Sequence, residues 1–411
     1  MTKRFNLFDE FKARGFVQQV TDEEAVRRLF EGEKVAAYIG FDPTASSLHV
    51  GSLVQILMLV HLERAGHRPI GIVGGGTGLV GDPSGREEMR QLLSPEKLRA
   101  NFEALKAQLG RFLDVQGGRA LVIDNAEWIA PLNYIDFLRD IGRHFSVNRM
   151  LAAEAYRIRL EKGLSFIEFN YQLLQAYDFL ILFRRHGCRL QMGGDDQWGN
   201  ILAGTDLIRR EEGGDAHGLT SPLLATADGK KMGKTAQGAV WLDGSMTSPY
   251  DFYQYWINVD DRDVERFLKL FTFLPLDEIS RLSRLQGAEL REAKKVLATE
   301  VTRFVHGEEE AAKAEVASRA LFDGEGDADE APTTAWPADQ DLSKATVVDI
   351  LVLTRLASSR TAASNLVKQG GVTLNGNRVD DFRRPVSRED FGDQGLLIRV
   401  GKKRYHRVVL S

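Results

Sequence analysis

His49 stands at the start of the part of the chain best suited to bind an anion. It follows a short apolar stretch (residues 35–41) and a loop of Pro, Thr and Ser, and it precedes residues whose apolar positions recur with helical spacing. The first turn of such a helix has backbone N–H groups without partners and the positive end of the helix dipole, which together favour a phosphate. His49 and Ser52, three residues apart, would share one helix face. The alternative is an ordinary strand-to-helix connection with a surface histidine.

A second group of cations lies in the glycine-flanked segment 228–238, Asp-Gly-Lys-Lys-Met-Gly-Lys-Thr-Ala-Gln-Gly. Ammonium groups concentrated in such a loop suit a polyphosphate leaving group. The segment lacks the Gly-x-x-x-x-Gly-Lys-Ser/Thr spacing of phosphate-loop ATPases. Alone it is also compatible with a solvated surface loop.

Two strands are predicted to end in glycine turns that carry polar residues. Residues 69–85 contain Asp82, and residues 188–200 contain Gln191, Asp196 and Gln197. In an open parallel sheet these side chains would lie at the carboxyl edge, where such sheets bind ligands. Asp82 could instead form only an Asx turn before the following proline.

Tyr171, Gln175 and Asp178 interrupt an otherwise apolar helix predicted over residues 165–186. At 100° per residue the three fall on one face. A tyrosine, an amide and a carboxylate, without the lysines and glutamates of a solvated stripe, indicate the polar wall of a pocket. Buried groups of this kind need hydrogen bonds from a ligand or from one another. The alternative is that they form the solvent face of the helix.

Composition limits the class of protein. With 43% hydrophobic residues the chain can form a large core, and no apolar run approaches the roughly 20 residues of a membrane span. The N-terminus lacks the apolar segment of a secretory signal, and the single Cys188 permits no intrachain disulfide. We therefore predict a cytoplasmic protein. Leu138, in a helix predicted over 132–145, could face the core or a subunit interface.

The C-terminal end differs from the body in charge. Residues 346–411 hold 12 Lys and Arg residues against 6 Asp and Glu residues, although the whole chain has a net charge of -4. The acidic, Gly- and Pro-containing stretch before it predicts a linker. The basic end reads as two helices, a strand from Val372, an Asn375-Gly376 turn and a return strand. It predicts either a nucleic-acid-binding module or merely a solvated basic surface.

Five motifs in register resemble bacterial tyrosyl-tRNA synthetases, a family of class I aminoacyl-tRNA synthetases. They are Gly40-Phe-Asp-Pro-Thr44 with His49-Val-Gly51, Gly81-Asp-Pro-Ser-Gly85, the Tyr171/Gln175/Asp178 helix, Gly194-Asp-Asp-Gln-Trp-Gly-Asn200 and Lys231-Met-Gly-Lys-Thr235. The resemblance covers essentially the full chain. It implies an α/β fold, with a Rossmann-like parallel-sheet catalytic domain, a small α-helical domain and a C-terminal α+β RNA-binding module of the S-four type. The expected boundaries are residues 1–238, with a helical insertion at about 86–160, then 239–322, an acidic linker at 323–345, and 346–411.

The same resemblance implies that the tyrosine carboxylate attacks the α-phosphorus of ATP and that the acyl group then passes to tRNA(Tyr). L-tyrosine, ATP with Mg²⁺ and tRNA(Tyr) would be the partners of a homodimer, with no tightly bound cofactor, no metal site in the protein and no membrane. The residues implied for tyrosine are Tyr38, Asp82, Tyr171, Gln175, Asp178, Gln191 and Gln197. Those implied for ATP and the adenylate are Gly40, Asp42, Thr44, His49, Gly51, Ser52, Asp196 and Lys234, with His49, Lys231, Lys234 and Thr235 as the catalytic set. For RNA, Arg355, Arg360, Lys368 and Arg378 are expected to contact phosphates.

One position departs from the family. By resemblance, residues 43–52 correspond to the family's HIGH element, named after its usual sequence. That element usually ends in histidine, whereas this chain has Ser52, which can donate a hydrogen bond but cannot carry positive charge. Two alternatives stay open at this point. One is another class I synthetase such as the tryptophanyl enzyme, against which the Tyr38/Asp178 pair argues. The other is an RNA-binding relative with reduced catalysis.

Overall fold

The computed structural model describes residues 5–32, 34–84, 93–152, 156, 160–161, 163–229, 232–235, 238–322, 331, 333–337, 340–354, 356–357, 359–392, 395–401 and 404–410. The chain divides into two compact units. The first unit comprises residues 1–233, 241–243 and 260–286, and the second comprises residues 234–240, 244–259 and 287–411.

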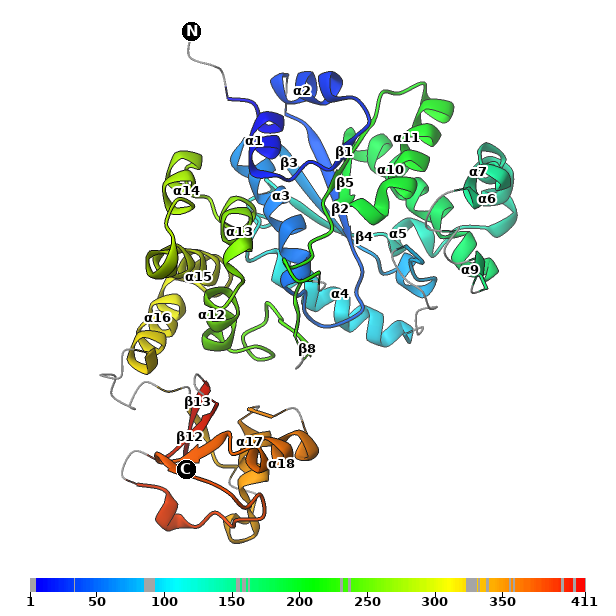
Figure 1. Cartoon of the computed structure of the whole chain (residues 1–411). Coiled ribbons are helices and arrows are strands. Elements are labelled where there is room, and N and C mark those ends of the chain that lie inside the picture. Colours follow the sequence, from blue (N-terminus) through cyan, green and yellow to red (C-terminus); the bar gives the residue numbers. More distant parts are fainter. Residues whose placement is uncertain are drawn as a thin grey trace. The chain divides into compact units, whose positions relative to one another are not determined.

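A six-stranded sheet organises the first unit (Figure 1). Its order is β1 (Gln19–Val20), β6 (His217–Ser221), β5 (Cys188–Gly194), β2 (Ala36–Phe41), β3 (Arg68–Val73) and β4 (Leu121–Asp124). All neighbours are parallel except β1 and β6. The predicted Rossmann-like parallel sheet is confirmed. The chain runs outward from β2 through β3 to β4 and then returns to β5 and β6, so the switch point lies between β2 and β5, where open α/β sheets bind ligands.

Helices pack against both halves of this sheet. Next to β2, β3 and β4 lie α3 (Leu53–Arg64) and α4 (Pro95–Leu109), and next to β5 and β6 lie α10 (Tyr171–His186) and α11 (Trp198–Glu212). The predicted apolar positions of α3 are buried, and Ser94 caps α4 through its hydroxyl oxygen. The long helix predicted over 165–186 is divided at Asn170 into α9 (Phe166–Phe169) and α10.

The remaining helices of the first unit are shorter. They are α1 (Leu7–Arg14), α2 (Glu23–Glu31), α5 (Ala126–Ile129), α6 (Tyr134–Asp140), α7 (Val147–Leu151), α13 (Val264–Phe271) and α14 (Leu276–Leu282). Strand β4 lies inside the range predicted as a helical insertion, so sheet and helix alternate there. Helices α13 and α14 lie in the range predicted as a separate helical domain, but they belong to the first unit. Arg14, 4% exposed, donates to the carbonyls of Thr272 and Leu274 and so ties α1 to the end of α13.

The second unit contains α12 (Pro249–Ile257), α15 (Leu290–His306), α16 (Glu308–Phe322) and the hairpin of β7 (Lys234–Thr235) and β8 (Gly238–Ala239). It also contains α17 (Val347–Leu353), α18 (Arg360–Lys368) and a sheet of order β11, β10, β12, β13, β9. These strands are β11 (Asn377–Arg378), β10 (Val372–Leu374), β12 (Leu396–Val400), β13 (Arg404–Val409) and β9 (Thr333–Ala335).

The C-terminal sheet corrects one expectation. Residues 333–335 lie within the stretch predicted as an acidic linker, yet they form β9 and pair in parallel with β13. The acidic composition hid two β-branched residues, Thr333 and Thr334, that suit a strand. The predicted hairpin at Asn375-Gly376 is confirmed, with φ of 46° and 83° at the two turn residues. Among the described residues, no helix is long and apolar enough to span a membrane.

Candidate active site

Tyr38 and Gln191 lie opposite each other in register on β2 and β5, at the switch point of the sheet. Each is 2% exposed. Among the described residues, the Tyr38 hydroxyl and the Gln191 Oε1 atom are buried without a hydrogen-bond partner. An unpaired buried polar atom costs about 1–3 kcal/mol, so this pair indicates a place where a polar ligand binds.

Asp178 of α10 faces the same region. It is 4% exposed. Burial raises the pKa of the Tyr38 phenol well above its ordinary value, and the Asp178 carboxylate raises it further. Burial raises the pKa of Asp178 itself to about 7, against the opposing effect of two hydrogen bonds. We therefore expect the carboxyl group of Asp178 to gain or lose its proton near neutral pH.

Asn125 and Trp128 supply those two hydrogen bonds, and sequence reasoning gave them no role. The Asn125 Nδ2 atom donates to Asp178 Oδ2 at 2.9 Å, and the Trp128 indole donates to Asp178 Oδ1 at 2.7 Å. Asn125 is in turn fixed by the Gly76 N–H and the Thr77 hydroxyl. The signal was present as Asn125 directly after β4, at the carboxyl edge of the sheet, with Trp128 in the following helix α5.

Asp82 and the amides of α10 and η4 (Asp195–Gln197) form a second polar cluster. Gln197 donates to Asp82 Oδ2 at 2.8 Å, and Gln175 donates to Gln197 Oε1 at 3.1 Å. Asn200, also without a predicted role, donates to Gln175 and Gln197. Burial, followed by the nearby Asp42, raises the pKa of Asp82 to about 6. The Ser84 N–H donates to Asp82 Oδ1, so the predicted Asx turn exists and leaves the other oxygen for the cluster.

The polar face of α10 is turned inward. Tyr171 and Asp178 are buried and Gln175 is half-buried, so the interpretation of these residues as a solvent face is wrong. Their hydroxyl, amide and carboxylate are grouped on the helix that packs beside β5. The structure therefore brings together a phenol, two carboxylates and several amides, which suits an amino acid with a hydroxyl at one end and an ammonium at the other.

His49 lies at the beginning of the turn η1 (Val50–Ser52), ahead of α3. Its Nδ1 atom accepts from the Gly51 N–H at 2.9 Å, so the proton of the neutral ring is on Nε2. Ser52 N–H donates to the His49 carbonyl. The first-turn donors that we expected to be free for an anion are thus partly occupied.

The other predicted nucleotide-binding residues of the first unit lie in or after strands β2 and β5. Gly40, at the end of β2, and Thr44 are exposed, whereas Asp42, Ser52 and Asp196 are half-buried. A Cβ at Gly40 would meet open space. Lys231 lies outside the described residues, and only the backbone of Lys234 and Thr235 is described.

The predicted RNA contacts fall on the C-terminal module. Arg360 pairs with Asp349 at 2.5 Å and Arg378 pairs with Asp380 at 3.0 Å. The Lys368 ammonium lies 4.9 Å from the centre of an aromatic ring, that of Phe382. Arg355 lies outside the described residues.

Comparisons with known proteins agree with this geometry. A family model described as tRNA synthetases class I (W and Y) matches residues 31–323, and one described as the tyrosine–tRNA ligase SYY-like C-terminal domain matches residues 325–408. Tyrosine–tRNA ligases from Caldanaerobacter subterraneus subsp. tengcongensis and Clostridium tetani are each 53% identical to the chain over 406 residues, which is 99% of its length and 100% and 99% of theirs. The chain belongs to the tyrosine–tRNA ligase family.

Solved structures of this family share the fold. A C-terminally truncated Aspergillus nidulans mitochondrial tyrosyl-tRNA synthetase matches with a TM-score of 0.70 and 32% identity, over 78% of this chain and 95% of that one. The Archaeoglobus fulgidus tyrosyl-tRNA synthetase complexed with L-tyrosine matches with a TM-score of 0.58 at 18% identity, over 75% of this chain and 100% of that one, and shows the fold alone. Membership of the tyrosine–tRNA ligase family implies the use of ATP.

Proposed function

We propose that the chain activates L-tyrosine with ATP and then transfers the tyrosyl group to the 3′ end of tRNA(Tyr). In the first step a tyrosine carboxylate oxygen attacks the α-phosphorus of ATP. The bond from this phosphorus to the bridging oxygen breaks, and pyrophosphate leaves with that oxygen. In the second step a hydroxyl of the terminal ribose attacks the carbonyl carbon, and AMP leaves.

The observation that carries the proposal is the buried hydroxyl of Tyr38 beside the carboxylate of Asp178. A substrate phenol placed between them can accept from Tyr38 and donate to Asp178. Phenylalanine would leave both groups buried and unpaired, which disfavours it strongly. The cluster of Asp82, Gln175 and Tyr171 would then bind the substrate ammonium. A tryptophan indole has no hydroxyl to satisfy the first pair.

The turn that begins at His49 would interact with the phosphates of ATP. Its Nε2 proton would stabilise negative charge on the phosphates as pyrophosphate leaves. Lys231, Lys234 and Thr235 would act on the same phosphates, and Mg²⁺ would arrive with ATP. Catalysis of this kind rests on positioning and charge stabilisation, without a covalent enzyme intermediate.

Pyrophosphate exchange with ATP and a panel of amino acids tests the proposal. We expect exchange with tyrosine and none comparable with phenylalanine or tryptophan. His49→Ala should slow exchange about 100-fold, the scale of losing one charge-stabilising donor, while leaving tyrosine binding unchanged. Exchange that depends on another amino acid would contradict the proposal, and an unaffected His49→Ala variant would contradict the role of His49.

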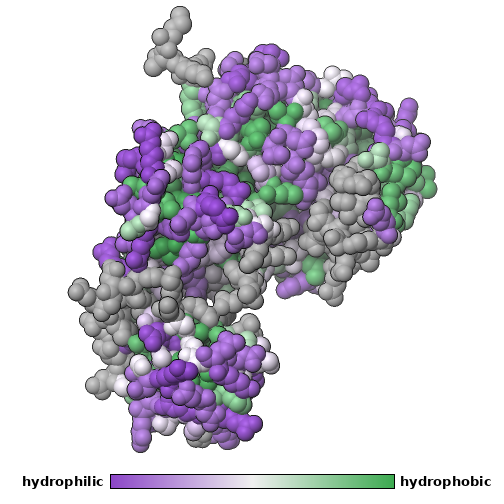
Figure 2. Space-filling view, viewed as in Figure 1, coloured by the Kyte–Doolittle hydropathy of each residue, from purple (hydrophilic) through white to green (hydrophobic). Residues whose placement is uncertain are grey.

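We also propose that two copies associate through an apolar surface on the first unit. Exposed hydrophobic side chains gather over α6 and α7 in Figure 2. Ile135 is 67% exposed and Leu138 is 37% exposed, so Leu138 does not belong to the core. The exposed apolar residues on α6, α7 and α9 are Tyr134, Ile135, Leu138, Val147, Phe166 and Ile167. Such a concentration is typical of a subunit interface.

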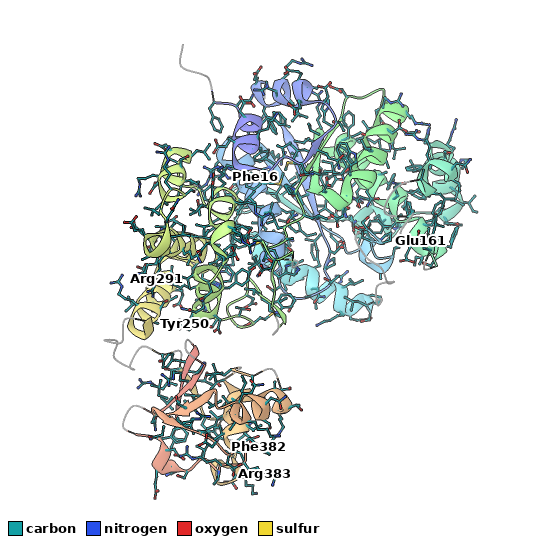
Figure 3. The ribbon with its side chains drawn as sticks, viewed as in Figure 1. Phe16, Glu161, Tyr250, Arg291, Phe382 and Arg383 are labelled. Atoms are coloured by element: carbon teal, nitrogen blue, oxygen red, sulfur yellow. The ribbon has the colours of Figure 1, made fainter. Side chains whose placement is uncertain are left out.

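We propose that the protein acts in the cytoplasm. We also propose that its C-terminal module binds RNA. Two cations lie near the ring of Phe382. The Lys368 ammonium is 4.9 Å from the ring centre, and the guanidinium of Arg383 is 5.3 Å from it (Figure 3). Cations held beside an aromatic ring suit a phosphate backbone with adjacent bases. The carboxylates paired with Arg360 and Arg378 are exposed or near the surface, so a phosphate can replace them at small cost.

A further inference from the structure

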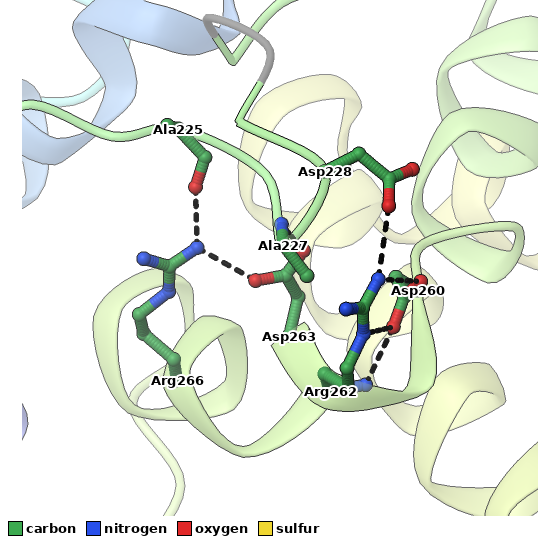
Figure 4. Close-up of polar contacts among 7 residues, drawn as sticks. All are labelled: Ala225, Ala227, Asp228, Asp260, Arg262, Asp263 and Arg266. Atoms are coloured by element: carbon green, nitrogen blue, oxygen red, sulfur yellow. Dashed lines mark hydrogen bonds and ion pairs between the residues drawn. The ribbon is translucent and has the colours of Figure 1, made fainter.

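Asp263 connects helix α13 to the segment that leads into residues 228–238, the glycine-flanked segment with Lys230, Lys231 and Lys234, called the lysine loop below. It is 3% exposed and is the last residue of η5 (Asp261–Asp263). Its Oδ2 atom accepts from the Ala227 N–H at 2.8 Å. Its Oδ1 atom accepts from Arg266 Nη2 at 2.6 Å, and the same Nη2 donates to the Ala225 carbonyl (Figure 4). The buried carboxylate thus fixes the Ala227 N–H directly and the Ala225 carbonyl through the guanidinium of Arg266.

A second ion pair nearby differs in its surroundings. Arg262 donates to Asp228 at 2.9 Å and to Asp260 at 2.8 Å (Figure 4). The side chains of Arg262 and Asp228 are 63% and 62% exposed. Water and salt screen such a pair, so it contributes little to the stability of the local structure. It offers a matched control for the buried contact.

The described residues on both sides of Lys231 have hydrogen-bonded backbone groups. The Gly229 N–H donates to the Thr226 carbonyl at 2.8 Å, and the Met232 N–H donates to the Leu224 carbonyl at 3.0 Å. Gly233 follows with a φ of 77°, and a Cβ there would lie 2.9 Å from the backbone nitrogen of Gly51. Among the described residues, the backbone at 225–227 is therefore bonded to Asp263 and Arg266, and Gly233 lies against the turn that carries His49.

We propose that Asp263 is a positioning residue for adenylate formation, because it fixes the backbone from which the lysine loop extends. This inference rests on the proposed function. Asp263 acts through residues 225–227 and has no role in binding the amino acid. Its side chain makes no capping hydrogen bond to α13, so its loss removes the contact with the loop and leaves the helix cap as it is.

Asp263→Ala, Asp263→Asn and Arg266→Met test the proposal, with Arg262→Met as the control. We expect Asp263→Ala to slow tyrosine-dependent pyrophosphate exchange by about 10- to 100-fold, the cost of misplacing catalytic groups from a distance. Asp263→Asn keeps an acceptor for Ala227 and should recover part of the loss. Arg262→Met should stay near the wild-type rate. Tyrosine affinity, measured by equilibrium dialysis, should be unchanged in all four variants, which also shows that each is folded.

A double-mutant cycle with Lys234→Ala separates positioning from general structural damage. If Asp263 acts through the loop, adding Asp263→Ala to Lys234→Ala should cost far less than it costs the wild type. Additive losses, or a wild-type rate in both Asp263→Ala and Arg266→Met, would overturn the proposal. If Asp263→Ala does not fold, Arg266→Met and Asp263→Asn give the same comparison. A wild-type chain without tyrosine-dependent exchange would instead contradict the proposed function.

Discussion

The protonation of two buried carboxylates should control amino-acid binding. The pKa of Asp178 is raised to about 7 and that of Asp82 to about 6, both chiefly by burial. We expect both to carry a proton in most molecules at pH 5.5, where Asp178 would not accept from the phenol as a carboxylate and Asp82 would not pair with the ammonium. Both become ionised as the pH rises, and the phenol and ammonium of free tyrosine do not titrate in this range.

We therefore expect tyrosine affinity to increase as the pH rises from 5.5 and to level off only as the pH approaches 8, about one unit above the pKa of Asp178. Equilibrium dialysis across pH 5.5 to 8 measures this. Asp178→Asn is the control, since it should remove the part of the increase near pH 7 and leave the part near pH 6. Affinity that falls across this window would show that the protonated acids bind the substrate.

Single residues also mark the limit of sequence reasoning. Asp82 and Asp178 could be placed in a pocket from their residue types and their positions after a strand or on a helix face, whereas Tyr38, inside β2, was expected only from the family resemblance. Asn125 and Trp128 could not be assigned, because they act on Asp178 some 50 residues further along the chain, and spacing carries no information on which carboxylate they meet. The sequence likewise could not predict that Gln191 Oε1 is buried without a hydrogen-bond partner, because its burial depends on the side chains packed around it.

At the scale of elements, the turn before α3 depends on Gly51. A Cβ at this position would lie 2.6 Å from His49 Cε1, so the imidazole must move if any other residue is present. Gly51→Ala should reduce adenylate formation about 10-fold or more with unchanged tyrosine binding, because the ring is displaced while the amino-acid pocket is left intact.

Single-turnover rates of adenylate formation measure this effect. Gly110→Ala is the control, since its helical backbone (φ -65°, ψ -10°) suits alanine and its nearest atom would be 3.4 Å away. Equal rates in the two variants would mean that the His49 ring does not need its present position.

Elements were predicted well where periodicity is strong and poorly where composition misleads. The apolar spacing of α3 and the Asn375-Gly376 hairpin gave correct elements. Strand β9 was missed because its few residues lie within an acidic stretch, and its pairing with β13 is set by a partner about 70 residues away. Local patterns specify local structure, whereas the membership of a short strand in a sheet is a tertiary property.

At the scale of the whole molecule, the apolar surface on α6, α7 and α9 should determine assembly. Ile135→Asp places a charge on a side chain that is 67% exposed, and it should convert a dimer to monomers. Phe5, 66% exposed, lies elsewhere in the chain, so Phe5→Asp serves as the control and should not change the mass. Sedimentation velocity distinguishes these outcomes. A dimer that persists in Ile135→Asp would exclude this face as the interface.

Deleting residues 331–411 should separate the two half-reactions. The cut must precede β9, because a deletion starting at residue 342 would leave this strand without β13. The module has a hydrophobic core of its own, from Trp336 to Val408, and a C-terminally truncated relative has a solved structure. We expect adenylate formation close to that of the full chain. Charging of tRNA should weaken and depend less steeply on salt, because each lost phosphate contact removes about 0.7–0.9 from the slope of log affinity against log salt. Unchanged charging with an unchanged salt slope would place RNA binding wholly outside this module.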